Sequence, residues 1–147
     1  MLLFQSILWL CLATMAYGGY DYYVSGQFTC QGKPLIGRVY LYEDDFVSDD
    51  YVDEGTLDEN GGFYLYGYLD DGWPDGSVEP YLEIYHQCGH PGRQCVKTVY
   101  SLENYRDNPL KLGTMRIDIL GYEKMAKVYH SWYDCQYVMD NPQPYTP

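Results

Sequence analysis

A strict alternation of aliphatic residues and tyrosines within short runs constrains the fold of this chain more than any other feature. In the run Gly62–Leu69, one side of an extended strand carries Phe63, Leu65 and Leu69, and the other side carries Tyr64, Tyr66 and Tyr68. Successive side chains of a strand point to opposite faces, so a period of two predicts a strand with one face in the core. The runs Gly37–Glu43 and Tyr81–Gln87 show the same alternation.

Clusters of Gly, Asp, Asn and Pro separate these runs at the spacing typical of a β-sandwich. The pattern predicts strands over Tyr22–Thr29, Gly37–Glu43, Gly62–Leu69, Tyr81–Gln87, Gln94–Leu102 and Gly113–Leu120. The segment Glu123–Tyr137 has only weak amphipathic spacing, so its structure stays open. No long helical period appears, and we expect an all-β sandwich of about seven strands.

The first residues, 1–18, have the pattern of a secretory signal peptide. Leu2 to Ala16 is almost uninterrupted apolar sequence and ends in Ala16-Tyr17-Gly18, which predicts cleavage near Gly18. An uncleaved membrane anchor is the alternative, but the apolar run is short for the roughly 20 residues of a span. We expect one domain over residues 19–140, a disordered tail over 141–147, and a secreted, extracellular protein.

Cysteine usage predicts two disulfides. Of the five cysteines, Cys11 lies in the predicted signal peptide, which leaves Cys30, Cys88, Cys95 and Cys135. An even number in an oxidising compartment favours disulfides, and three pairings are possible. The turn-like Gly89-His90-Pro91-Gly92 between Cys88 and Cys95 favours a bridge between those two, and Cys30–Cys135 then follows by elimination.

A metal site is the alternative interpretation of the same segment. Its candidate ligands are His86, Cys88, His90 and Cys95, a mixture that zinc accepts. A ligand cysteine must stay reduced, whereas the secretory route favours disulfides. The glycines and the proline would also break the strand before His90 aligned with the other ligands. We therefore predict disulfides, with no metal and no cofactor.

The net charge of −12 limits the possible partners. Such a chain should not bind nucleic acid or an anionic membrane through its bulk charge. Acids concentrate in Glu43–Glu59, and a calcium site is one interpretation of Asp44, Asp45, Asp49, Asp50 and Asp53. These acids lack the order of an EF-hand loop, so a solvated acidic loop is the interpretation that we favour. No later segment is apolar enough to span a membrane.

Several segments, in order, are similar to those of one known family. They are Gly26–Pro34, Val39–Glu43, Asp58–Phe63, Glu79–Cys88, Cys95, Leu112–Met115 and Asp134-Cys135. Together they resemble the transthyretin-like proteins that are abundant in nematodes. The chain departs from that pattern at Ser101-Leu102-Glu103, where the family usually has Ile-Pro, and in the atypical segment Tyr122–Tyr133.

The resemblance implies a prealbumin-like Greek-key sandwich and secretion. One family member bridges phosphatidylserine on dying cells and a phagocyte receptor, which makes a cell-surface protein or lipid head groups candidate partners. Some sandwiches of this type are hydroxyisourate hydrolases with a C-terminal Tyr-Arg-Gly-Ser, but this chain has Tyr133-Asp134-Cys135-Gln136. It also lacks Gly-x-Ser-x-Gly and His-Glu-x-x-His, so we predict no enzyme. Fold analogy alone suggests a second hypothesis, an oligomeric carrier of a small hydrophobic ligand.

Tyrosine is the residue type that we expect to carry binding. It offers a large contact area at little entropic cost, with a hydroxyl that tolerates water. Tyrosines that simply decorate a solvent face as good strand formers are the alternative. The predicted surface consists of the outward-facing Tyr40, Tyr42, Tyr64, Tyr66, Tyr68, Tyr81 and Tyr85. We expect a non-catalytic binding or adaptor protein, with an oligomeric state that stays open.

Overall fold

The computed structural model describes residues 18–45, 48–70, 78–89, 94–117 and 126–140. Within these ranges the chain forms strands and one short helix. The elements are β1 (Tyr20–Cys30), β2 (Lys33–Pro34), β3 (Gly37–Glu43), β4 (Asp50–Thr56), β5 (Gly62–Leu69), β6 (Pro80–His86), β7 (Gln94–Ser101), β8 (Leu110–Ile117), β9 (Ala126–Asp134) and α2 (Cys135–Asp140). The predicted tail 141–147 lies outside the described residues, as does the predicted signal peptide apart from Gly18.

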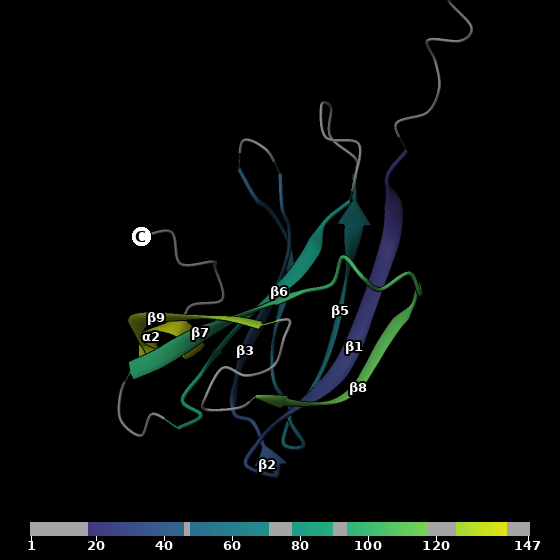
Figure 1. Cartoon of the computed structure of the whole chain (residues 1–147). Coiled ribbons are helices and arrows are strands. Elements are labelled where there is room, and N and C mark those ends of the chain that lie inside the picture. The colour runs from purple at the N-terminus through teal and green to yellow at the C-terminus, as the bar shows by residue number, and fades with distance from the viewer. Residues whose placement is uncertain (1–17, 46–47, 71–77, 90–93, 118–125, 141–147) are drawn as a thin grey trace, which may run out of the picture.

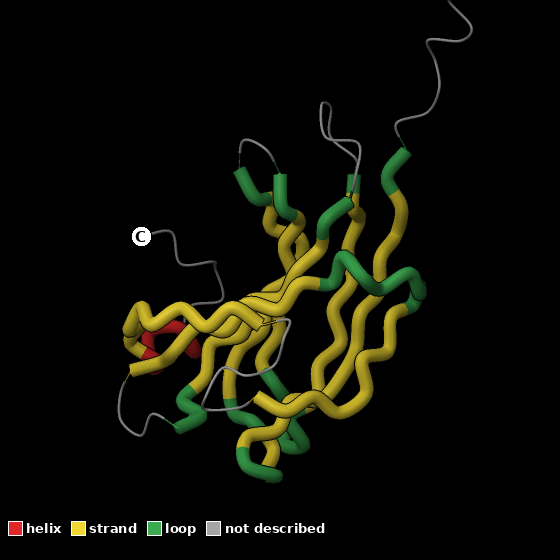
Figure 2. Tube along the Cα trace, in the orientation of Figure 1, coloured by secondary structure: helices red, strands yellow, loops and turns green. Residues whose placement is uncertain are grey.

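The strands form two sheets (Figures 1 and 2). In one sheet β1 pairs antiparallel with β2 and β5, and parallel with β8. The other sheet has the antiparallel order β4-β3-β6-β7-β9. This arrangement confirms the predicted all-β sandwich. None of the described helices could cross a membrane, since α2 has only six residues.

The main core lies between the sheets and consists of the aliphatic halves of the alternating runs. Side chains with at most 2% exposure include Val24 and Phe28 of β1, Val39 and Leu41 of β3, Leu65 and Leu69 of β5, and Leu82 and Ile84 of β6. Burying each such side chain contributes roughly 1.5–3 kcal/mol. The rings of Phe28 and Phe63 stack across the β1–β5 pair, with centroids 5.0 Å apart.

The strands with the clearest alternation have the predicted bounds, since β3 and β5 begin and end where the sequence places them. The other predicted strands differ by a few residues, and 118–120 of the last one lie outside the described residues. Three strands, β2, β4 and β9, were not predicted from the sequence. β4 lies in the acidic stretch expected to be a loop, and β9 with α2 lies in the segment whose structure was left open.

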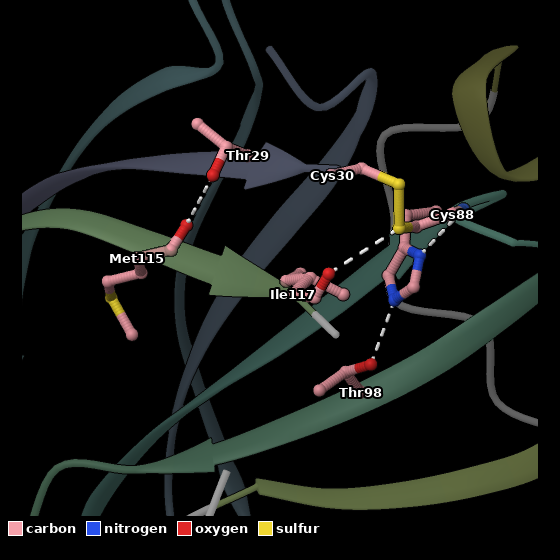
Figure 3. Close-up of a disulfide and its surroundings, with 7 residues drawn as sticks. Thr29, Cys30, Cys88, Thr98, Met115 and Ile117 are labelled. Atoms are coloured by element: carbon pink, nitrogen blue, oxygen red, sulfur yellow. Dashed lines mark hydrogen bonds between the residues drawn. A yellow bond between two sulfur atoms is a disulfide. The ribbon is translucent and has the colours of Figure 1, made fainter. Parts of the chain in front are cut away.

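The disulfides are Cys30–Cys88 and Cys95–Cys135, so the predicted pairing of Cys88 with Cys95 is wrong. The two cysteines face opposite sides of one sheet. Cys88 lies in the main core, with its sulfur 3.5 Å from the carbonyl oxygen of Ile117 (Figure 3). Cys95 is fully buried on the outer side, beside Val138 of α2. Closeness in sequence did not bring them together, because Cys88, in the turn after β6, enters the main core and Cys95 enters the smaller core beside α2.

Candidate binding surface

A row of exposed tyrosines covers the outer side of β5. Tyr64, Tyr66 and Tyr68 are 64%, 46% and 59% exposed. Tyr23 of β1 is directly opposite Tyr66 in the strand register, and the two rings stack with centroids 4.7 Å apart. The Tyr64 ring lies 6.4 Å from the same Tyr23 ring. We call these four residues the tyrosine face.

Tyr23 was missing from the predicted surface. The signal that could have identified it is the neighbouring Val24, whose place in the core turns Tyr23 outward. Its position opposite Tyr66, however, depends on how β1 and β5 align, and the sequence does not state that register. The tyrosine face therefore joins two strands that are about forty residues apart in the sequence.

Two carboxylates from different strands contact Tyr66. Its hydroxyl donates a hydrogen bond of 3.2 Å to Oδ1 of Asp21 on β1, and its backbone N–H donates one of 2.8 Å to Oδ2 of Asp53 on β4. The hydrogen bond to the Asp21 carboxylate raises the pKa of Tyr66 above its ordinary value. Tyr66 therefore remains a neutral hydrogen-bond donor at physiological pH.

The bond to Asp53 also holds the edges of the two sheets together. β4 is the edge strand of its sheet, and its Asp53 accepts the N–H that Tyr66 turns away from β1. Gly67 allows this approach, because a Cβ there would collide with Val52. The edge of β5 is thus partly covered by a charged side chain, as is common for edges protected from unwanted strand pairing.

Polar residues and a base lie at the Tyr64 end of the face. Lys111 of β8 pairs with Ser25, whose other neighbour in the sheet is Tyr64. An open hollow of about 690 Å³ lies here, and Gln27 and Thr114 line it, joined by a 3.1 Å hydrogen bond from the Thr114 hydroxyl. This hollow is open to solvent and lined by both polar and apolar atoms, unlike the enclosed apolar pockets that hold small hydrophobic ligands.

The tyrosines on the second sheet are placed differently from the prediction. Tyr40 and Tyr85 are only 2% and 4% exposed, so the expectation that they face outward to solvent is wrong. They belong to a second, smaller core with Cys95, Cys135 and Val138. The reason is that α2, tethered by the Cys95–Cys135 bridge, packs over the outer side of this sheet.

The remaining two predicted tyrosines, Tyr42 and Tyr81, are half-buried at the rim of this second core. Their rings stack with centroids 5.5 Å apart, and the Tyr81 hydroxyl donates a 2.6 Å hydrogen bond to Asp49. Burial raises the pKa values of both hydroxyls. Of the seven tyrosines in the predicted surface, Tyr64, Tyr66 and Tyr68 are therefore the ones with open outer faces, and their role in binding stays a prediction.

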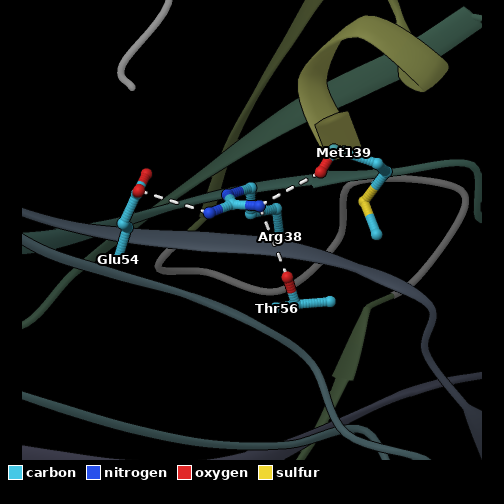
Figure 4. A network of polar contacts seen from close by, with 4 residues as sticks. All are labelled: Arg38, Glu54, Thr56 and Met139. Atoms are coloured by element: carbon cyan, nitrogen blue, oxygen red, sulfur yellow. Dashed lines mark hydrogen bonds and ion pairs between the residues drawn. The ribbon is translucent and has the colours of Figure 1, made fainter. Parts of the chain in front are cut away.

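A buried arginine links α2 to the sheet below it (Figure 4). The Arg38 guanidinium pairs with Glu54 at 3.2 Å and donates hydrogen bonds to the Thr56 hydroxyl and the Met139 carbonyl. Its Cζ atom lies 5.9 Å from the centre of the Tyr40 ring. Every one of these contacts is internal, which gives this charged residue a structural role.

The second ion pair of the described residues lies on the same side of the sheet. Lys97 contacts a Glu83 oxygen at 2.7 Å, and the Tyr85 hydroxyl donates a 3.0 Å hydrogen bond to the other oxygen. Burial is the main cause that raises the pKa of Tyr40 to about 12, with Arg38 opposing it. The outer side of this sheet thus carries two largely buried ion pairs, and within them Arg38 Nε and Glu54 Oε2 have no hydrogen-bond partner among the described residues.

The cysteines of the predicted zinc alternative are unavailable as thiolates, since both are oxidised in separate disulfides. His86 is also engaged, because its Nδ1 accepts the Cys88 N–H at 3.0 Å and its Nε2 lies 2.8 Å from the Thr98 hydroxyl (Figure 3). His90 lies outside the described residues. Across the parts of the chain that are described, no group of three His, Cys, Asp or Glu residues could hold a metal ion, calcium in the acidic stretch included.

Fold and surface together define a class of protein: a β-sandwich with two disulfides, one outer face covered by a helix and the other carrying exposed tyrosines. The model of the Transthyretin-like family matches residues 25–101. Transthyretin-like protein 33 of Caenorhabditis elegans is 33% identical over 107 residues, which cover 65% of this chain and 73% of that protein. Transthyretin-like protein 46 of the same organism is 30% identical over 68% of this chain and 58% of its own length.

The chain therefore belongs to the transthyretin-like family, which confirms the resemblance seen in the sequence. These relatives are named as transthyretin-like proteins and not as enzymes. Among solved structures, a 9R-lipoxygenase from Cyanothece aligns with a TM-score of 0.41 and 20% identity, over 67% of this chain and 16% of the lipoxygenase. That likeness is too low to carry an argument.

Proposed function

We propose that this chain is a secreted, non-catalytic binding protein that contacts a partner protein outside the cell through the tyrosine face. The observation that carries the proposal is the row Tyr64, Tyr66 and Tyr68, which is open to solvent and braced by the stacked ring of Tyr23. Two disulfides and the family are consistent with an extracellular protein.

The physical reason is that an exposed tyrosine can contribute a large contact area to an interface at a small cost in conformational entropy. A tyrosine ring buries a large area on binding, and its hydroxyl keeps a polar partner in the interface. Tyrosine is enriched among the residues that dominate binding energy. Strand pairing and the Tyr23–Tyr66 stack already restrict the rings, so little rotamer freedom is lost when a partner covers them.

The other functions considered from the sequence receive less support. A carrier of a small hydrophobic ligand needs an enclosed apolar cavity, whereas the hollow beside Tyr64 is open to solvent. A hydroxyisourate-type hydrolase would rest on fold analogy alone. Lipid head groups stay a candidate partner from the family resemblance, and an extracellular or cell-surface protein is the partner that the tyrosine face favours.

The test begins with the full chain expressed in secretory cells, where we expect the processed protein in the medium. The labelled protein is then titrated onto intact nematode cells, and onto phosphatidylserine vesicles as a separate arm. We expect saturable binding to cells that falls at least tenfold in Tyr64→Ser/Tyr66→Ser. Tyr137→Ser is the matched control, because Tyr137 is 52% exposed but lies on α2. Equal binding by wild type and the double variant, or no saturable binding, would overturn the proposal.

A further inference from the structure

We propose that the tyrosine face binds an extended peptide segment of its partner, with an arginine of that segment held against Tyr66 between Asp21 and Asp53. The inference rests on the proposed function and adds the chemistry of the partner. An arginine side chain is planar, always charged, and able both to stack on an aromatic ring and to pair with carboxylates. Each of these properties has a counterpart around Tyr66.

The first counterpart is the pair of carboxylates on either side of Tyr66. Asp21 accepts the Tyr66 hydroxyl from the β1 side, and Asp53 accepts the Tyr66 N–H from the β4 side. In the described part of the chain, the ion pairs use Glu54 and Glu83, and no base pairs with either aspartate. Each carboxylate has oxygen lone pairs beyond the hydrogen bond that it accepts from Tyr66. A cation that arrives at Tyr66 therefore meets two negative charges that no basic residue of the described ranges pairs with.

The second counterpart is the aromatic surface. A guanidinium over an exposed tyrosine ring is attracted to the electron-rich face of that ring. Tyr66 and Tyr68 are about half exposed or more, and the Tyr23 stack fixes Tyr66 in place. The combination of a fixed ring and flanking carboxylates favours arginine over lysine, because only the guanidinium is flat enough to stack and to form two parallel hydrogen bonds.

The third counterpart is the spacing of the row. Alternate residues of a strand lie roughly 6–7 Å apart on one face, so Tyr64, Tyr66 and Tyr68 repeat at the distance between alternate side chains of an extended peptide. A partner segment in extended form can thus set alternate side chains between successive rings. A helix presents its side chains at other intervals.

The charges along the face also give the segment a direction. Asp21 pairs with Tyr68 in the register, whereas Lys111 lies beside Ser25 at the Tyr64 end. Arg116 follows Lys111 further along β8, beside Thr29. We therefore place the basic residue of the segment at the Tyr66–Tyr68 end and expect no base opposite Tyr64. A net charge of −12 attracts a basic partner and opposes the approach of a second copy or an anionic vesicle.

Fluorescence anisotropy with a defined probe tests the inference. The probe is an eight-residue peptide with a single arginine among threonines, blocked at both ends and labelled, titrated with the full chain at about 0.15 M salt to screen diffuse attraction. Tyr66→Ser and Asp21→Asn should each weaken binding by about fivefold or more. The matched controls are Tyr137→Ser and Glu103→Gln, which remove an exposed ring or carboxylate elsewhere and should change binding less than twofold.

Peptides with citrulline or lysine in place of arginine provide the chemical controls. We expect the citrulline peptide to bind at least tenfold more weakly and the lysine peptide to lie between the two. Equal affinity for the citrulline peptide would overturn the inference, because the cation would then contribute nothing. Equal losses from Asp21→Asn and Glu103→Gln would also overturn it, since binding would follow net charge and not this site.

Two further outcomes would identify a different occupant. Wild-type dimers that Tyr66→Ser converts to monomers in sedimentation would assign the face to a second copy, and saturable binding to phosphatidylserine vesicles through the same tyrosines would assign it to lipid. The Arg–Thr peptide is finally used as a competitor in the cell-binding titration. If Tyr64→Ser/Tyr66→Ser abolishes cell binding but the peptide does not compete, the proposed function stands and the arginine inference fails. If that variant keeps cell binding, both fail.

Discussion

The two outer faces of this sandwich carry similar tyrosines, yet one face is covered and the other is open. Tyr66 on β5 is 46% exposed, whereas Tyr40 on β3 is 2% exposed. Both alternate with aliphatic residues that enter the main core. The difference comes from α2, which the Cys95–Cys135 bridge fastens over the β3–β6–β7 side. A tyrosine opposite a core residue can therefore belong to a binding surface or to a second core, depending on what lies above it.

Matched serine substitutions on the two faces should produce the largest contrast. Tyr40→Ser removes a buried ring that packs edge-on against Tyr85, with ring centroids 5.5 Å apart, so we expect a loss of about 3–5 kcal/mol of unfolding free energy. Tyr68→Ser, on the open face, should change stability by about 0.5 kcal/mol or less. Urea denaturation of the two variants checks this. Similar losses in both would contradict the division into a covered and an open face.

Removal of the covalent tether is expected to open the covered face. The Cys95–Cys135 bridge closes a separation of 40 residues, so Cys95→Ala/Cys135→Ala should lower the free energy of unfolding by about 4 kcal/mol on the loop-entropy model. Denaturation together with limited proteolysis after residue 134 measures the effect. Unchanged stability and unchanged cleavage would mean that packing alone holds α2 in place.

Substitution of the buried Arg38 tests how much the polar contacts between α2 and the sheet contribute to stability. Arg38→Met leaves Glu54 without its cation at a site where both side chains are nearly buried, with an expected cost of about 3 kcal/mol. Arg38→Met/Glu54→Gln should recover much of that loss, because no unpaired charge then remains. Thermal or urea unfolding of the three proteins measures the coupling. A double variant no more stable than Arg38→Met would indicate that Arg38 acts mainly through the Thr56 and Met139 contacts.

Alkaline pH should lower the free energy of unfolding through Tyr40 on the covered face, an effect smaller than those of the substitutions above. Burial raises the pKa of Tyr40 to about 12, above its ordinary value of 10.0. Between these values the unfolded chain loses the Tyr40 proton while the folded chain keeps it, so stability falls as pH rises, by at most about 1.4 kcal/mol per pH unit. Urea denaturation at pH 9 to 11 should show a shallower decline in Tyr40→Phe than in wild type. The same slope in both would contradict this assignment.

Local pattern was sufficient for much of the fold. The bounds of β3 and β5 followed from the alternation of their residues, because side-chain direction in a strand is a property of neighbouring residues. β4 escaped prediction because its acidic composition is typical of a loop. Its acids are compatible with a strand only because Asp53 accepts the Tyr66 N–H and Glu54 pairs with Arg38, partners that are distant in the sequence.

The candidate site was predicted only in part, for a similar reason. The alternation correctly predicted that Tyr64, Tyr66 and Tyr68 face outward, and it also placed Tyr40 and Tyr85 outside the main core. It could not show that α2 would cover those two. Nor could it show that Tyr23 would lie opposite Tyr66, since strand register joins segments far apart in the chain.

Residue order alone therefore established the sandwich, its family and the even set of cysteines that become disulfides, because alternation, composition and cysteine parity are written in local sequence. The pairing of those cysteines and the identity of the open face arose only when the sheets assembled. Cys88 and Cys95 lie on opposite sides of one sheet, and each finds its partner in a different layer. Long-range packing decides which tyrosines are exposed to solvent, because the outer face of a sheet becomes a second core where another element packs on it.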